Sequence, residues 1–328
     1  MNKKLKIFVN YILGPILFVW FSFSIYNQIS HQKNLLQTWQ NIENNFTTAQ
    51  WLNCFLVFIL MFVNWGLETK KWQLLIKGVE EIKFLKAFRA VFSGQAFALN
   101  TINNLGEYVG RVLFLGDGNR LRAISLTMVG SMSQVLVTFI MGAIALFFSR
   151  VLFAQKGLGD GGLTAFWYNG LMFVLVTCTT LLTMIYFSLS WVTKAVEKIP
   201  IFRKYAFLIQ KVEDFTPKEL TKVLLFSFFR YVVFVMQYLL LLNVFQVNAS
   251  ITLLALMICV IFLILAIVPT IALTELGLRG QISIQLLGLL SPNTAGIVFT
   301  ATGIWFINRV FPALAGSLFV LGVKIFKR

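Results

Sequence analysis

The sequence predicts an all-α fold, a polytopic integral membrane helical bundle with about eight spans. Of its 328 residues, 58% are hydrophobic and only 12% are charged, whereas soluble domains have roughly 45–50% and about 25%. A helical span needs about 20 apolar residues, so this length leaves little room for an extramembrane domain. The composition therefore excludes a disordered chain, a fibrous protein and almost any soluble enzyme.

Apolar runs give the order of the expected spans. The first run follows a basic start and is too long for a cleavable signal peptide, so we expect a signal anchor. Two later segments are interrupted by polar residues, and their pattern leaves open whether they cross the membrane or re-enter it. The uninterrupted spans are expected near 7–29, 51–68, 123–149, 166–192, 223–245, 251–271 and 297–323, and the interrupted segments at 84–106 and 272–290.

The net charge of +16 is concentrated in alternate loops. Basic side chains gather before the first span, around 70–86, in the loop 193–222 and at the C-terminal end. The loops on the other side carry only Lys33, Arg150 and Lys156. This positive-inside pattern predicts that both termini are cytoplasmic, in a bacterial-type inner membrane. Attraction to anionic lipid is a secondary effect, and nucleic acid is not an expected partner.

The polar segments carry none of the sequence motifs expected of a soluble catalytic domain. The longest of them, 193–222, has no nucleotide-binding loop and no nucleophile–base pair. The three cysteines lie in apolar runs without metal-ligand spacing, and His31 is the only histidine. We therefore expect no cofactor and no metal site. The sequence predicts one transmembrane domain over 1–328, with pseudo-repeat halves at about 51–192 and 223–323 joined by the cytoplasmic loop 193–222.

Two charged pairs interrupt the apolar pattern in similar ways. Glu107 precedes Arg111 by four residues after an Asn-Asn-Leu-Gly run, and Glu275 precedes Arg279 by four residues after a proline. This spacing places each pair on one helix face, with Glu in the favourable N-terminal position. Paired, interrupted segments indicate the binding site of a transporter, where helix N-termini and arginines suit phosphate. Membrane-edge ion pairs that hold helices together are the alternative interpretation.

Two further arginines lie inside apolar runs, where a charge costs at least about 2.5–3.5 kcal/mol. Arg230 is about two turns into its expected span, so snorkelling back toward Lys222 remains an open alternative. Arg309 lies near the middle of the last span, too deep to snorkel. We predict that Arg309 faces the protein interior, within reach of Glu275 or Glu107.

These residues resemble the lysylphosphatidylglycerol synthase transmembrane-region family, the flippase half of multiple-peptide-resistance factors. Gly106-Glu107-Tyr108-Val109-Gly110-Arg111 matches its Gly-Glu-x3-Arg segment, and Arg230 with Gln237-Tyr238 is similar to its middle motif. Pro269, Glu275, Gly277 and the Arg309 span are similar to its final motif. The chain departs in having Asn103-Asn104 in place of a proline, and in placing the second Glu before its Gly. The resemblance implies the membrane half alone, with two pseudo-repeats, re-entrant helices and a cavity for lipid headgroups.

Three functional hypotheses remain. We favour a lipid translocase, or flippase, over a membrane-embedded transferase on a lipid-linked substrate and over a scaffold subunit of an envelope-assembly complex. The expected partners are membrane phospholipid or a lipid-linked substrate, with a second copy of the chain or an envelope-assembly protein as further candidates. The residues expected to line the translocation path are Glu107, Arg111, Arg230, Glu275, Arg279 and Arg309.

Overall fold

The protein is helical throughout the part that the computed structural model describes, which is residues 23, 47–99, 101, 104–155, 165–191, 193, 211–270 and 272–321. The expected span at 7–29, both chain ends and most of the 193–222 loop lie outside these residues. The helices are α4 (Thr48–Ile76), α5 (Phe84–Ala98), α6 (Gly106–Val112), α7 (Arg120–Gln155), α8 (Ala165–Phe187), α12 (Pro217–Val244), α13 (Ile251–Ile267), α14 (Ala272–Leu287), α15 (Thr294–Trp305) and α16 (Phe311–Leu321).

Five helical stretches among the described residues are long and apolar enough to cross a membrane. A sixth helix, α13, is strongly apolar but has only 17 residues. This arrangement supports a membrane-embedded helical protein. The five stretches are Thr48–Ile76, Asp117–Leu152, Phe166–Phe187, Pro217–Val244 and Thr294–Val320.

Helix ends follow local capping chemistry where the sequence supplies it. Thr216 and Glu219 form a capping box around Pro217 at the start of α12, an arrangement that satisfies the first free backbone N–H groups of a helix. Asn293 caps α15 by accepting a hydrogen bond from the Gly296 backbone N–H at 2.8 Å. The expected break before each charged pair is present, because α5 ends before α6 begins and α13 ends before α14 begins.

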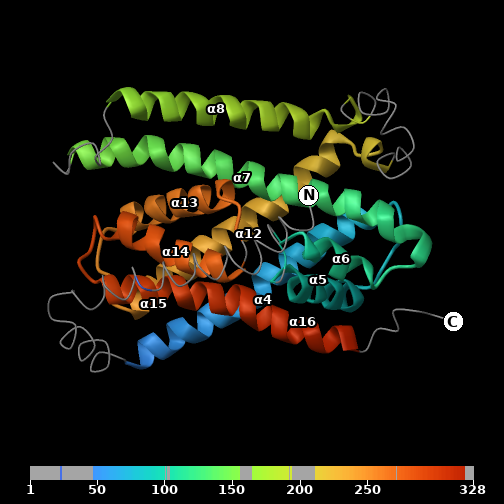
Figure 1. The fold of residues 1–328 in the computed structure, drawn as a ribbon, viewed down its shortest axis with the longest axis horizontal. Coiled ribbons are helices and arrows are strands. Elements are labelled where there is room, and N and C mark those ends of the chain that lie inside the picture. Colours follow the sequence, from blue (N-terminus) through green and yellow to red (C-terminus); the bar gives the residue numbers. More distant parts are fainter. Residues whose placement is uncertain are drawn as a thin grey trace.

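The bundle is arranged around two long helices, α4 and α12, which pack against each other in its middle (Figure 1). The short pair α5–α6 follows α4, and the short pair α13–α14 follows α12. In space, α5 packs against α16, whereas α13 packs against α7. One helix of each short pair therefore packs against a helix from the other half of the chain. Helix α8 lies at the edge of the bundle, beside α7 (Figure 1).

Glycines allow α5 to approach its neighbours closely. A Cβ atom on Gly110 of α6 would lie 2.6 Å from the Ser93 carbonyl oxygen. A Cβ atom on Gly316 of α16 would lie 1.9 Å from the Phe92 carbonyl oxygen. Small residues that let backbones meet in this way are typical of helix contacts in membranes. This packing fixes α6, and the charged residues that it carries, in the interior of the bundle.

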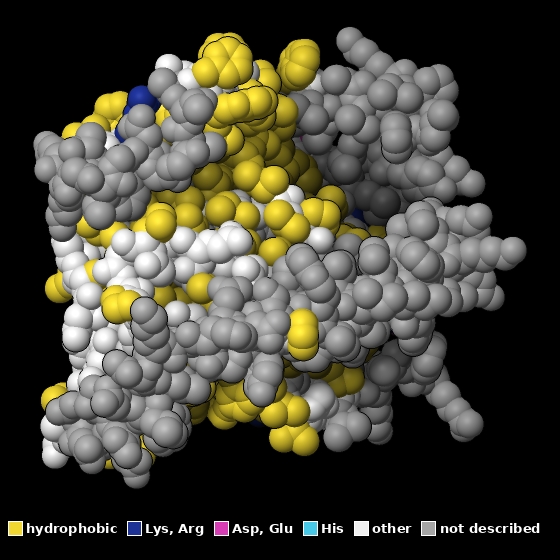
Figure 2. All heavy atoms as spheres, turned by 60° about the vertical axis from the view of Figure 1, so that its left-hand side comes forward, with side chains coloured by type: hydrophobic (Ala, Val, Ile, Leu, Met, Phe, Trp, Pro, Cys, Tyr) yellow, Lys and Arg dark blue, Asp and Glu magenta, His cyan; other side chains and the backbone are white. Residues whose placement is uncertain are grey.

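Hydrophobic side chains dominate the described part of the face shown in Figure 2. On α8, Phe166, Trp167 and Phe173 are among the most exposed large side chains of the described residues. Such exposure is unusual for a water-soluble surface and suits contact with lipid. By contrast, Glu68, Lys71, Arg111 and Glu275 are buried inside the bundle.

Candidate functional site

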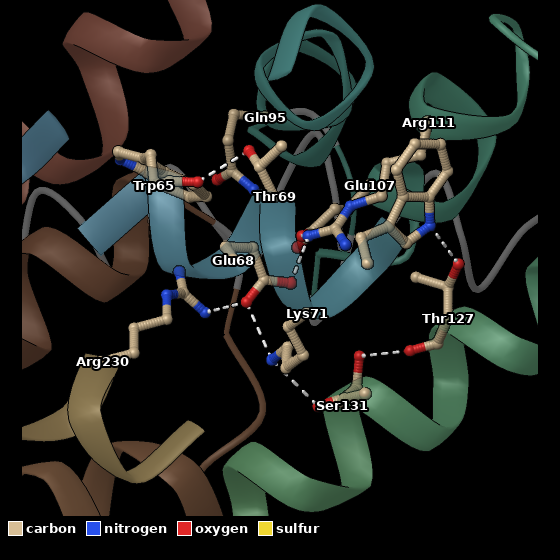
Figure 3. Close-up of polar contacts among 12 residues, drawn as sticks. Trp65, Glu68, Thr69, Lys71, Gln95, Glu107, Arg111, Thr127, Ser131 and Arg230 are labelled. Carbon is tan, nitrogen blue, oxygen red and sulfur yellow. Dashed lines mark hydrogen bonds and ion pairs between the residues drawn. The ribbon is translucent and has the colours of Figure 1, made fainter. Parts of the chain in front are cut away.

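The interior of the bundle contains a carboxylate, Glu68 of α4, that binds three cations (Figure 3). Lys71 Nζ, Arg111 Nη2 and Arg230 Nη1 each lie 2.8 Å from a Glu68 carboxylate oxygen. The three come from α4, α6 and α12, so Glu68 joins helices from both halves of the chain. Only 4% of Glu68 is exposed. A buried carboxylate with this many partners is a strong structural link, because removing it would leave Lys71 and Arg230 without a carboxylate partner and Arg111 with Glu107 alone.

Lys71 is held by neutral partners as well as by Glu68. Its ammonium group donates to the Gly130 carbonyl oxygen at 3.2 Å and to the Ser227 hydroxyl at 3.3 Å. Ser133 of α7 in turn lies 2.6 Å from the Ser227 hydroxyl. These contacts tie α4 to α7 and α12. Lys71 is therefore a buried part of the network, not a residue of the cytoplasmic loop as its place in the sequence suggests.

Arg111 binds two carboxylates, Glu68 and Glu107. The ion pair with Glu107 confirms that the residues of the first charged pair share one helix face. Arg111 is almost fully buried. Its Nε–H has no hydrogen-bond partner within the described part of the chain. This N–H is a buried donor whose hydrogen-bonding capacity is not used within the described residues.

Arg230 points into the bundle. Its Nη1 donates to Glu68 at 2.8 Å and its Nε donates to Asn64 at 2.7 Å. The guanidinium also lies over the Trp65 ring, 4.9 Å from its centroid. The side chain does not turn back along α12 toward Lys222, because Glu68 and Asn64 of α4 hold its guanidinium. Helix α12 also begins at Pro217, earlier than the expected span. Arg230 is thus about 20 Å along the helix by its rise, with its counter-ion at the same level.

The second charged pair forms a separate cluster with Arg309. Glu275 accepts from Arg279 Nη2 at 2.8 Å and from Arg309 Nη2 at 3.4 Å. Arg309 Nη1 also donates to the Gln95 side chain at 3.1 Å. The prediction that Arg309 faces the interior within reach of Glu275 is confirmed. The cluster again joins both halves of the chain, since Gln95 belongs to α5.

A pair of buried asparagines connects the two clusters. The last span is not a continuous α-helix, because Phe306–Val310 forms a π-helical turn between α15 and α16. Such turns are frequent at functional sites. This turn carries both Arg309 and Asn308, and Asn64 donates to the Asn308 side chain at 3.2 Å. Asn64 also accepts from Arg230, so one amide links the Glu68 cluster to the turn that holds Arg309.

The two clusters together carry more positive than negative charge. Five cations and three carboxylates give a formal excess of two positive charges, from five minus three. Arg279 resembles Arg111 in having a buried Nε–H without a hydrogen-bond partner in the described part of the protein. The excess charge and the unused donors suit an anion. The members are Glu68, Glu107, Glu275, Lys71, Arg111, Arg230, Arg279 and Arg309.

The sequence pattern identified six of these eight residues as candidates for the translocation path and missed the other two. Glu68 and Lys71 were expected at the end of a span and in a loop, because the apolar run stops near residue 68. In the structure α4 continues to Ile76 and buries both side chains. The available signal was their spacing, since a carboxylate and a cation three residues apart share a helix face.

Outside the membrane-spanning helices, Glu80 connects the loop after α4 to the loop after α6. It accepts from the Gly116 backbone N–H at 2.9 Å, from Asn119 at 3.1 Å and from Lys86 at 3.3 Å. Partial burial acts to raise the pKa of Glu80, but these hydrogen bonds outweigh it, so the pKa lies below its ordinary value. The contact restrains the end of α6 beside the network.

The network consists of ion pairs and hydrogen bonds between side chains. Within the described ranges, no three His, Cys, Asp or Glu side chains gather as metal ligands. The three carboxylates are paired with arginine or lysine, which leaves them acting as counter-ions for those cations. Comparison of the chain with protein-family models, with curated proteins and with solved structures finds no match.

Proposed function

We propose that the protein is a lipid translocase that binds an anionic lipid headgroup at the interior cationic network. The observation that carries the proposal is the excess of cations over carboxylates inside a membrane-embedded bundle. Intramembrane charges are expensive and mark substrate or ion pathways. A phosphate-containing headgroup would balance the excess charge and use the free N–H groups of Arg111 and Arg279.

The carboxylates have a defined role in this proposal. Glu107 and Glu275 neutralise and orient Arg111, Arg279 and Arg309 while no headgroup is bound. A phosphate that enters replaces part of these contacts by binding the same guanidinium groups. The exchange of one anion for another avoids leaving an arginine unpaired in the membrane interior.

The helix arrangement supports a transporter over a static scaffold. Each half of the chain has a long helix followed by a broken short pair and further helices, and one helix of each short pair, α5 or α13, packs against the other half. We infer a two-fold pseudo-repeat around α4 and α12, with α5–α6 and α13–α14 as its interrupted elements. Transporters built in this way bind substrate near the middle of the membrane, at the contact between repeats. The resemblance of Gly106–Arg111 to the lysylphosphatidylglycerol synthase transmembrane-region family favours the same function.

The expected setting is a bacterial-type inner membrane with both termini in the cytoplasm. The described basic residues near the C-terminal end of α4 and the start of α12 agree with this orientation, because Lys77 and Lys83 are exposed after α4 and Lys218 is exposed in the first turn of α12. In this orientation the Glu68 cluster lies nearer the cytoplasmic end of α4 than its other end. Headgroups would enter the network from that leaflet or leave toward it.

The experiment is a translocation assay in liposomes that contain the purified protein. Phosphatidylglycerol or phosphatidylcholine with a fluorescent tail reports movement between leaflets through quenching from outside. We expect phosphatidylglycerol to move between leaflets faster than in protein-free liposomes. In Arg309→Leu, this increase in rate should be at least tenfold smaller. Arg309→Lys keeps the charge but loses the planar fork, so it should retain only part of the rate.

Lys218→Leu is the matched control, because it removes an exposed cation outside the network. It should translocate phosphatidylglycerol at the rate of the original protein. Lipid movement no faster than in protein-free liposomes would contradict the proposed function, and so would an Arg309→Leu variant of normal rate.

A further inference from the structure

A groove outside the ion network opens toward the membrane between α7 and α8. It has a volume of about 230 Å³ and lies beside Tyr108 of α6. Its walls are mostly apolar, and Met128 and Val135 at its edge are exposed to the surroundings. The lining residues are Tyr108, Met128, Ser131, Met132, Val135, Leu136, Leu182 and Tyr186.

The groove lies at the same level of α7 as the ion network, on another face of that helix. Gly130 accepts from Lys71, and Ser133 contacts Ser227, so these two residues face the network. Met128 and Met132, close in sequence to both, face the groove. Only about one helix diameter, roughly 10 Å, separates the two sites.

Tyr108 connects the groove to the charged residues of α6. Its hydroxyl donates to Ser131 at 3.0 Å, so it forms part of the groove wall. Tyr108 follows Glu107 directly and lies one turn before Arg111, whose buried Nε–H is unused. Residues three apart on a helix are neighbours on its surface. Tyr108 therefore places the wall of the groove, which is otherwise lined mostly by apolar side chains, beside the segment of α6 that carries Glu107 and Arg111.

We propose that this groove binds an acyl chain of the lipid whose headgroup occupies the network. The inference rests on the proposed function and adds the place of the lipid tail. The groove volume corresponds to about eight water molecules at roughly 30 Å³ each, which suits a segment of hydrocarbon chain. It is too small for a further helix of about 10 Å diameter. Flexible methionines line it, and such side chains adapt to differently shaped apolar ligands.

Photolabelling tests the groove directly, separately from translocation. The purified protein is placed in membranes that contain phosphatidylglycerol with a diazirine in one acyl chain, or phosphatidylcholine with the same chain. Adducts are located by mass spectrometry on residues 128–136 and, as a reference for bulk lipid, on the exposed side chains Phe173, Val174 and Val176 of α8. We expect the ratio of groove to reference adducts to be at least threefold higher with phosphatidylglycerol.

Two variants give matched comparisons. Met132→Trp fills the groove without touching the network and should lower the groove adducts at least threefold, whereas Val174→Trp on the lipid-exposed face of α8 should not change them. The proposal that the groove binds an acyl chain would be overturned by equal groove-to-reference ratios for the two lipids. Groove adducts that are unchanged in Met132→Trp would overturn it as well. Absent lipid translocation together with phosphatidylglycerol-selective groove labelling would instead contradict translocation and support the groove. Lipid translocation together with equal groove-to-reference ratios for the two lipids would support translocation and contradict the groove.

Discussion

At the scale of single residues, the two counter-ions of Arg111 have different roles. Glu68 holds Lys71, Arg111 and Arg230 together, whereas Glu107 contacts Arg111 alone among these cations. Glu107 is also partly exposed, while Glu68 is buried. Glu68 is therefore the more deeply integrated member of the network, and we propose Glu107 as the carboxylate that exchanges with a ligand.

This difference predicts opposite results for two equivalent substitutions. Glu68→Gln should destabilise the folded protein strongly, because breaking a buried ion pair on one side costs about 3–5 kcal/mol. Glu107→Gln should leave the protein folded, since Arg111 keeps Glu68, but should impair translocation. Thermal unfolding of both variants in detergent, followed by fluorescence, gives the comparison. A Glu107→Gln protein that unfolds as early as Glu68→Gln would indicate a purely structural pair.

At the scale of helices, close backbone packing determines where the charged residues lie. Gly110 brings α6 against α5, and Gly316 brings α16 against α5. Gly110, between Glu107 and Arg111, thus has a packing reason, since a side chain there would overlap Ser93. Helix α6 has only seven residues, so this contact is the main restraint on its position.

Adding one methyl group tests this packing. Gly110→Ala and Gly316→Ala should each lower the unfolding temperature, because overpacking costs about 1–3 kcal/mol. Gly66→Ala on α4 is the control, because a Cβ atom there meets nothing within 4 Å. That variant should unfold at the same temperature or higher, as Ala favours helix by up to about 1 kcal/mol over Gly. Equal effects at all three positions would refute the close contacts.

The loop contact of Glu80 predicts a dependence of stability on pH. Its pKa is lowered in the folded protein, so the folded state binds this proton less readily than the unfolded state. The stabilisation is complete above the ordinary Glu pKa of about 4.3 and is lost as the pH falls below it. Between pH 6 and pH 3.5, the original protein should lose more thermal stability than Glu80→Gln. Parallel curves for the two proteins would rule out this contribution.

Sequence reasoning located the helical breaks and both Glu–Arg pairs, because these depend on nearby residues. It predicted the contact of Arg309 with Glu275 from the cost of an unpaired charge in the membrane. It missed the central place of Glu68, since the three cations around it come from helices whose packing the sequence pattern does not specify. The π-helical turn at Phe306–Val310 interrupts the span expected at 297–323.

At the scale of the whole molecule, the proposed pseudo-repeat requires the two halves of the chain to have opposite orientations in the membrane. Thr48 at the start of α4 should face the outside, and Lys218 at the start of α12 should face the cytoplasm. Both residues are exposed, so each can carry a reporter.

Cysteine labelling in intact cells tests this arrangement. With Cys54, Cys178 and Cys259 replaced by Ser, Thr48→Cys should react with a membrane-impermeant maleimide, and Lys218→Cys should react only after the cells are opened. Labelling of Lys218→Cys from outside intact cells would contradict the orientation, and with it the proposed pseudo-repeat.

The central claim is that the interior arginines bind a lipid phosphate. The most direct measurement is an experimental structure of the protein in a phosphatidylglycerol-containing bilayer. We predict density for a phosphate group within hydrogen-bond distance of Arg111, Arg279 or Arg309, with Glu107 or Glu275 displaced from its partner. Lipid phosphates confined to the two membrane surfaces, with every arginine still bound only to its glutamate, would contradict the claim.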